Sequence, residues 1–130
     1  MDKIKQLFLL ALSTLTLYSA ATVYEKTVFA EWDKPSINVF YVLPQEVNDQ
    51  TEILFIIHGN SRNADGYIEV WANHAKDKNI ILIAPEFSRS KFSNYNTLQM
   101  SSSTGKILKN RDLYLNNSID IMFNHYKNLF

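Results

Sequence analysis

The chain has 130 residues, enough for one domain, and 46% of them are hydrophobic and 13% aromatic, which suffices for a buried core. Its 13 basic and 13 acidic residues balance, so it lacks the positive charge that holds nucleic acid, and we expect no nucleic-acid partner. Cysteine is absent, which excludes disulfides, thiolate metal sites and a cysteine nucleophile.

The first 21 residues have the layout of a secretory signal peptide. Lys3 and Lys5 precede an apolar run over residues 7–18, and small residues follow at 19–21. This run is shorter than the ~20 residues that a spanning helix needs, although a membrane anchor and a buried helix are alternative interpretations. We therefore expect export to the periplasm or the medium, a mature domain over residues 22–130, and no membrane contact after cleavage.

Two strands are expected next. Residues 23–32 give a weak strand signal, and residues 37–43 give a stronger one that ends at Pro44, because proline lacks the amide that a strand needs. Turn-forming residues at 33–36 separate the two. This pattern favours a β-hairpin at the edge of a sheet.

A strand–helix–strand unit follows. Residues 53–57 are apolar at every position, which is typical of a strand covered on both faces in a parallel sheet. Residues 80–84 repeat the pattern and end at Pro85. Between them, residues 64–78 carry apolar side chains at helical spacing, with Asn63 as a cap and Trp71 expected in the core. The unit predicts two parallel central strands.

The last predicted element is a helix. A long loop over residues 88–114 is followed by apolar side chains at helical spacing over 115–130, with Asn117 or Ser118 as the cap. The serine-rich stretch 101–104 has no strand before it, so we interpret it as loop rather than as a nucleophile site.

Nothing in the sequence favours a metal or a cofactor. His58, His74 and His125 fall on three separate predicted elements, and no pair of histidines has the spacing of metal ligands. Gly105 and Lys106 lack the rest of a phosphate-binding loop. We expect no metal site and no cofactor.

The end of the strand at 53–57 is the candidate site. It runs into His58-Gly59-Asn60 just before the predicted helix, and ligands of open α/β sheets bind where strands end and helices begin. Glycine permits a sharp turn, and amides beside a helix N-terminus point at negative charge. We therefore predict an anion-binding turn, with the alternative that Asn60, Ser61 and Asn63 are only turn and cap residues.

The stretch ILFIIHGNSRNADGYIEVWANHAKDKNIILIAPEF, residues 53–87, resembles the front half of an α/β-hydrolase. It is most similar to secreted esterases and poly(3-hydroxyalkanoate) depolymerase-like proteins, whose third strand ends in His-Gly and whose fourth strand ends in Ala-Pro. The resemblance implies the N-terminal half of an α/β-hydrolase sheet: an edge β-hairpin, a βαβ unit with two parallel central strands, and a C-terminal helix.

The same resemblance implies roles at the turn. The backbone amide of Asn60, with that of Ser61 next, supplies an oxyanion hole, and His58 and Gly59 shape the loop. From its place at the C-terminal end of a predicted strand, Glu86 is a candidate to line a pocket, with a loop carboxylate as the alternative. A small ester or a polyester is the substrate implied for the full-length family.

The chain departs from that family in its catalytic residues. It has only three glycines and no Gly-x-Ser-x-Gly, so we expect no catalytic nucleophile, acid or base in it. The main hypothesis is an N-terminal fragment of a secreted serine hydrolase, inactive alone. The alternatives are a non-catalytic exported binding protein and a membrane-tethered protein of unrelated role. Without a following strand, the apolar edge 53–57 predicts self-association.

Overall fold

The computed structural model describes residues 23–97, 101–102, 104–107 and 117–130. The predicted signal peptide, residues 1–21, lies outside the described residues. The elements in chain order are β1 (Glu25–Phe29), β2 (Ile37–Val42), β3 (Glu52–Phe55), α2 (Ala64–Lys76), β4 (Ile80–Glu86), the short 3-10 helix η1 (Tyr95–Thr97) and α3 (Ser118–Leu129). No helix in these described ranges has the length and apolarity to cross a membrane.

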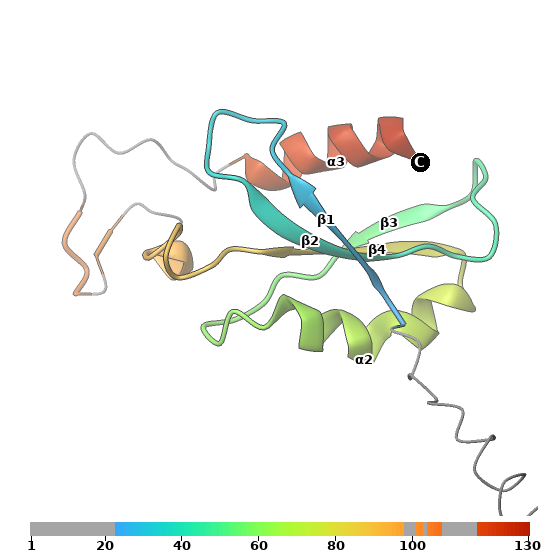
Figure 1. Ribbon diagram of the computed structural model, residues 1–130, viewed down its shortest axis with the longest axis horizontal. Helices are drawn as coiled ribbons and strands as arrows, with labels where there is room; N and C mark the ends of the chain where they lie inside the picture. The colour runs from blue at the N-terminus through green and yellow to red at the C-terminus, as the bar shows by residue number, and fades with distance from the viewer. Residues whose placement is uncertain (1–22, 98–100, 103, 108–116) are drawn as a thin grey trace, which may run out of the picture.

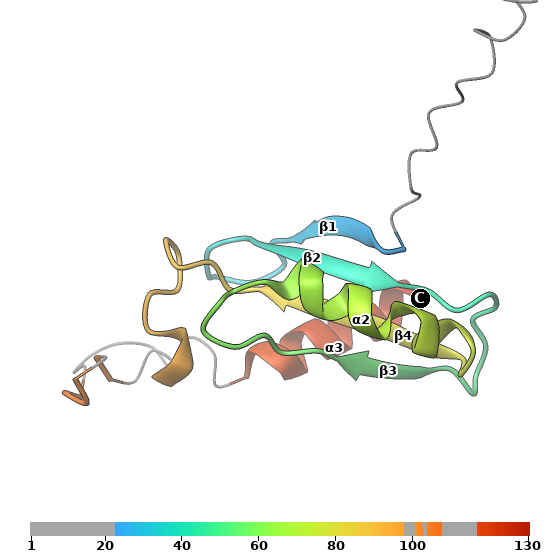
Figure 2. The same cartoon turned by 90° about the horizontal axis from the view of Figure 1, so that it is seen from below.

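The strands form one mixed sheet in the order β1-β2-β4-β3. β1 pairs antiparallel with β2, β2 pairs antiparallel with β4, and β3 runs parallel to β4. Helix α2 covers one face of the sheet and α3 the other (Figure 1), and Figure 2 shows β1 and β3 at the two edges. This architecture confirms the predicted α/β class, with its edge hairpin, βαβ unit and C-terminal helix.

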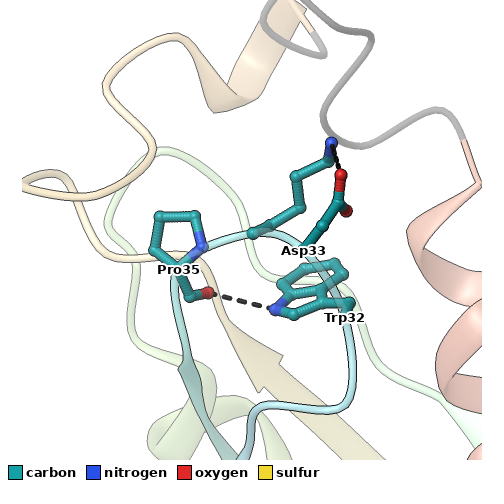
Figure 3. A network of polar contacts seen from close by, with 4 residues as sticks. Trp32, Asp33 and Pro35 are labelled. Carbon is teal, nitrogen blue, oxygen red and sulfur yellow. Dashed lines mark hydrogen bonds and ion pairs between the residues drawn. The ribbon is translucent and has the colours of Figure 1, made fainter.

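Local contacts hold the connection between β1 and β2. The indole Nε1 of Trp32 donates a 3.2 Å hydrogen bond to the carbonyl of Pro35 (Figure 3). Nζ of Lys34 lies 2.9 Å from a carboxylate oxygen of Asp33, and the Trp32 ring packs edge-on against Phe29. The predicted turn residues therefore form the turn of the hairpin.

Strand β4 supplies the centre of the molecule because it is buried on both faces. Its side chains alternate: Ile81 and Ile83 join the core under α3, whereas Leu82 and Ala84 join the core under α2. Met122 of α3 packs in the first of these cores. The continuous apolar pattern of residues 80–84 thus predicted the most buried strand.

Pro85 does not end β4, contrary to the sequence-based expectation. The strand continues to Glu86, and Pro85 pairs with Val39 of β2. The carbonyl of Ile83 is directed towards β3, where it accepts from the amide of Ile56. Alternate residues share this direction, and the paired part of β3 ends opposite Ile83. The nitrogen of Pro85 therefore points to a side of β4 where no paired strand lies, so its missing N–H leaves no acceptor without a donor.

Two burial predictions around β3 are wrong. β3 is a half-exposed edge strand rather than one covered on both faces, and 42% of Leu54 is exposed. Trp71, expected in the core, is 48% exposed. Helix α2 instead buries one isoleucine and three alanines against the sheet: Ala64, Ile68, Ala72 and Ala75. Its other large apolar side chains, Tyr67, Val70 and Trp71, are exposed.

Candidate functional site

A tight turn connects β3 to α2. The amide of Arg62 donates a 3.2 Å hydrogen bond to the carbonyl of Gly59, so residues 59–62 form a β-turn with Asn60 and Ser61 at its two central positions. Both central residues are exposed. Helix α2 begins at Ala64, so the turn lies between the carboxyl end of β3 and a helix N-terminus (Figure 1).

The two central amides of this turn are available to a ligand. Those of Asn60 and Ser61 donate to no other described residue. The carbonyl of Asn60 is occupied by the guanidinium of Arg89, whose Nη2 lies 2.8 Å away. This cation and the positive end of the α2 dipole both favour negative charge at the turn.

His58 holds the start of the turn in place through both nitrogens of its ring. It is only 2% exposed, and its Nε2 accepts a 3.0 Å hydrogen bond from the amide of Phe87. Nδ1 must therefore carry the ring proton, which it directs to the Gly59 carbonyl 2.9 Å away. Burial lowers the pKa of His58 below its ordinary value, and the nearby Arg62 charge acts in the same direction. The ring is thus held neutral.

Arg62 anchors the other end of the turn. Its φ is 61°, whereas Gly59 has no positive φ and an added Cβ there would meet only Tyr67 Oη at 3.7 Å. The left-handed position therefore belongs to the arginine, at a conformational cost. Its buried Nη1 donates to the carbonyls of Phe87 and Phe92, at 2.5 and 3.1 Å. These bonds offset the cost.

Tyr95 of η1 connects the two anchors. Its hydroxyl donates a 2.8 Å hydrogen bond to the carbonyl of His58, and the Arg62 guanidinium lies 4.6 Å from its ring centre. The ring also stacks on Phe87 at 5.2 Å. We call His58, Arg62, Phe87 and Tyr95 the loop clamp, because they hold both ends of the turn against the segment that follows β4.

The remaining predicted site residues lie apart from the clamp. Glu86 ends β4, and its Oε2 accepts a 2.6 Å hydrogen bond from Asn38 Nδ2 of β2. Asn63 occupies the N-cap position of α2, but its side chain makes no capping hydrogen bond. Within the described residues, no three His, Cys, Asp or Glu side chains gather as metal ligands would.

Sequence reasoning missed Arg62, Arg89, Phe87 and Tyr95. An arginine in a polar turn is usually solvated, and nothing near Arg62 in the sequence indicates that carbonyls 25 and 30 residues later would surround it. The one available signal was the group of aromatic residues at and after the end of β4: Phe87, Phe92 and Tyr95.

Comparison with known proteins bears on this site. No family model matches the sequence, and a search of curated proteins finds no match. Among solved structures, the chain is similar to poly(aspartic acid) hydrolase-1 from Sphingomonas sp. KT-1, with 29% identity, a TM-score of 0.66, and coverage of 82% of this chain and 41% of that one.

A second similar structure is LpqC, a poly(3-hydroxybutyrate) depolymerase from Bordetella parapertussis. Identity is 16% and the TM-score is 0.60, over 78% of this chain and 36% of that one. The 130 residues thus span less than half the length of either protein. Both neighbours are hydrolases, and this chain has a hydrolase-like α/β fold.

Proposed function

We propose that this chain supplies the oxyanion-binding turn of an exported hydrolase that cleaves acyl bonds. One observation carries the proposal: Asn60 and Ser61 are exposed residues whose amides donate to no other described residue, on a turn whose two ends are fixed by the loop clamp. Rigid donors aimed at developing charge stabilise a tetrahedral intermediate, and one such donor contributes about 3–4 kcal/mol to catalysis.

His58 does not act as the general base in this proposal. Its Nε2 accepts from the Phe87 amide and its Nδ1 proton is directed to Gly59, so neither nitrogen is available to take a proton from a nucleophile. Its role is to position the turn. Because the sequence contains no Gly-x-Ser-x-Gly, we propose that the nucleophile, acid and base belong to polypeptide outside these 130 residues.

The substrate class that we propose is an acyl polymer. The two similar hydrolases are named for poly(aspartic acid) and poly(3-hydroxybutyrate), an amide-linked polyanion and a polyester. Arg89 lies beside the turn, is exposed, and forms no ion pair with the described residues. A guanidinium with no carboxylate partner among the described residues favours a polymer that carries carboxylates. A small ester or a polyester, the substrate expected from the sequence, is the alternative.

The experiment begins with the DNA downstream of codon 130, read in all three frames. We expect an apolar strand followed by Gly-x-Ser-x-Gly, and the joined reading frame should hydrolyse an aryl ester or polyaspartate in a reaction blocked by a serine-directed inhibitor. The 130-residue chain alone should be inactive. Inhibitor-sensitive turnover by the short chain, or no such motif in any frame, would contradict the proposal.

Arg89→Gln tests the substrate class in the joined protein. If Arg89 selects carboxylates, this variant raises KM for polyaspartate several-fold more than KM for a neutral aryl ester. Equal changes in KM for both substrates would show that Arg89 does not select carboxylates and only binds the Asn60 carbonyl.

One feature favours a second function, that of a non-catalytic exported binding protein. The outer edge of β3 and the apolar surface beside it are uncovered in the described structure. Inactivity of the joined reading frame would favour this alternative.

A further inference from the structure

Contacts outside the sheet hold the segment that follows β4. The pairing of β4 with β2 ends where Glu86 lies opposite Asn38, whose side chain donates a 2.6 Å hydrogen bond to the Glu86 carboxylate. Residues 87–94 belong to no described helix or strand. The sheet therefore fixes this part of the chain up to Glu86, whereas Phe87 and Tyr95 of the loop clamp depend on contacts further along.

Lys91 links this segment to the turn of the β1–β2 hairpin. Its Nζ donates a 2.5 Å hydrogen bond to the carbonyl of Ser36, 55 residues earlier in the chain, and lies 3.2 Å from the Ser36 hydroxyl. Ser36 directly precedes β2, which begins at Ile37. Lys91 is exposed, and its ammonium forms no ion pair with a described carboxylate. Its partner is thus a backbone carbonyl whose position the sheet determines.

Phe92 makes a second connection between the two segments. It is buried, and its ring centre lies 6.3 Å from that of Trp32 in the hairpin turn. The indole of Trp32 is itself held by its hydrogen bond to the carbonyl of Pro35 (Figure 3). We call Trp32, Ser36, Lys91 and Phe92 the hairpin brace, because they attach the segment after β4 to the hairpin turn.

The hairpin brace and the loop clamp meet at the carbonyl of Phe92. This oxygen accepts a 3.1 Å hydrogen bond from Nη1 of Arg62 and a 3.2 Å hydrogen bond from the amide of Tyr95. Arg62 forms the end of the candidate turn, and the hydroxyl of Tyr95 donates to the carbonyl of His58 at its start. A single carbonyl therefore connects the brace to both ends of the turn.

We propose that Lys91 is a positioning residue for the oxyanion-binding turn and acts on it through Phe92 and Arg62. By holding the carbonyl of Ser36, Lys91 fixes the place of the next residue, whose carbonyl binds the Arg62 guanidinium. Without that bond the Phe92 carbonyl and the guanidinium can shift together, and the two central amides of the turn lose their single orientation. Donors stabilise developing charge only when they are oriented beforehand, so for its effect on catalysis this role rests on the proposed function.

Backbone ¹⁵N relaxation of the 130-residue chain tests the role of Lys91 without reference to catalysis. Lys91→Met removes the ammonium and keeps an unbranched side chain, whereas Lys127→Met, at an exposed position on α3, is the matched control. In Lys91→Met, the order parameters of the Asn60 and Ser61 amides should fall from about 0.85 towards about 0.6, and those within α2 should not change.

The conservative variant separates positioning from a general loss of stability. Lys91→Arg keeps a donor for the Ser36 carbonyl and should retain the wild-type order parameters of Asn60 and Ser61. Unchanged order parameters in Lys91→Met, or an equal decrease in Lys91→Met and Lys127→Met, would overturn the proposal.

A double-mutant cycle tests the route through Arg62. Arg62→Lys already lacks the guanidinium that binds the Phe92 carbonyl, so the addition of Lys91→Met to it should loosen Asn60 and Ser61 little further. Additive effects of the two substitutions on these order parameters would refute the route.

The joined reading frame distinguishes failure of this role from failure of the proposed function. Lys91→Met should lower kcat about 2–30-fold with KM nearly unchanged, and Lys91→Arg should not. If Asn60→Pro, which lacks the turn amide, loses activity while Lys91→Met keeps it, the positioning role is wrong and the proposed function stands. If Lys91→Met loosens the turn and neither variant changes kcat, Lys91 positions the turn and the proposed function is wrong.

Discussion

The backbone amide of Phe87 donates a 3.0 Å hydrogen bond to Nε2 of His58, which joins the segment after β4 to the segment after β3. This bond determines the tautomer of the ring, since an accepting Nε2 leaves the proton on Nδ1, 2.9 Å from the carbonyl of Gly59. Protonation of Nε2 would break the contact. The geometry of the turn therefore depends on a neutral His58.

The first prediction concerns pH. Burial lowers the pKa of folded His58 below the ordinary 6.5, so the unfolded chain binds a proton more readily than the folded one. The stabilisation by neutral His58 is thus complete above pH 6.5 and declines as pH falls towards the folded-state pKa. Urea unfolding at pH 7.5, 6.5 and 5.5 should give a falling free energy of unfolding, with a shallower fall in His58→Gln. An equal pH dependence of the free energy of unfolding in the wild type and in His58→Gln would contradict a lowered pKa for His58.

A second prediction concerns the contribution of His58 to stability. His58→Ala removes a buried ring and leaves the Phe87 amide without its partner, so it should lower the free energy of unfolding by about 1–3 kcal/mol. His74→Ala, at an exposed position on α2, is the matched control and should change it little. Chemical denaturation of both variants provides the measurement.

Arg62 gives the third prediction. Arg62→Lys keeps the charge but loses the planar group that reaches the carbonyls of Phe87 and Phe92 and lies over Tyr95. We expect a loss of about 1–3 kcal/mol and larger motions of Asn60 and Ser61 in ¹⁵N relaxation. Arg89→Lys, at an exposed position, should leave stability nearly unchanged. An Arg62→Lys turn as rigid as the wild type would show that the clamp does not need the guanidinium.

Two tyrosines, the half-buried Tyr95 and the buried Tyr126, give a fourth prediction with opposite signs. The Tyr95 hydroxyl donates to His58, so Tyr95→Phe should cost about 0.5–1.5 kcal/mol. The Tyr126 hydroxyl is buried without a partner among the described residues, and burial raises its pKa to about 12. Tyr126→Phe should therefore leave stability unchanged or increase it by up to ~1 kcal/mol. Thermal unfolding of the two variants distinguishes these outcomes.

The sequence predicted the fold well where burial decided it. The run of residues 80–84 reads as a strand covered on both faces, and β4 is that strand. The same pattern at 53–57 was misleading, because β3 ends at Phe55 and lies at an edge. Composition identifies an apolar strand but does not reveal which neighbours cover it. The sequence likewise does not reveal which face of α2 the sheet covers, and Trp71, expected in the core, lines a surface groove.

The sequence predicted where the turn of the candidate site lies but not the side chains of the loop clamp that hold it. His58-Gly59-Asn60 between an apolar strand and a helix predicts a turn, and the described structure has one there, with Asn60 and Ser61 at its central positions and α2 beginning at Ala64. The clamp depends on contacts between residues 58–62 and 87–95, which no local pattern encodes. The left-handed backbone of this turn lies at Arg62, which no sequence pattern indicates.

The account is tested most directly by removing one amide from the turn of the joined, active reading frame. Asn60→Pro deletes the N–H, whereas Asn60→Ala keeps it and serves as the control. Loss of one oxyanion donor should lower kcat of Asn60→Pro by about 10²–10³ relative to Asn60→Ala, with little change in KM. A folded Asn60→Pro enzyme whose kcat equals that of Asn60→Ala would contradict the claim that this turn binds the oxyanion.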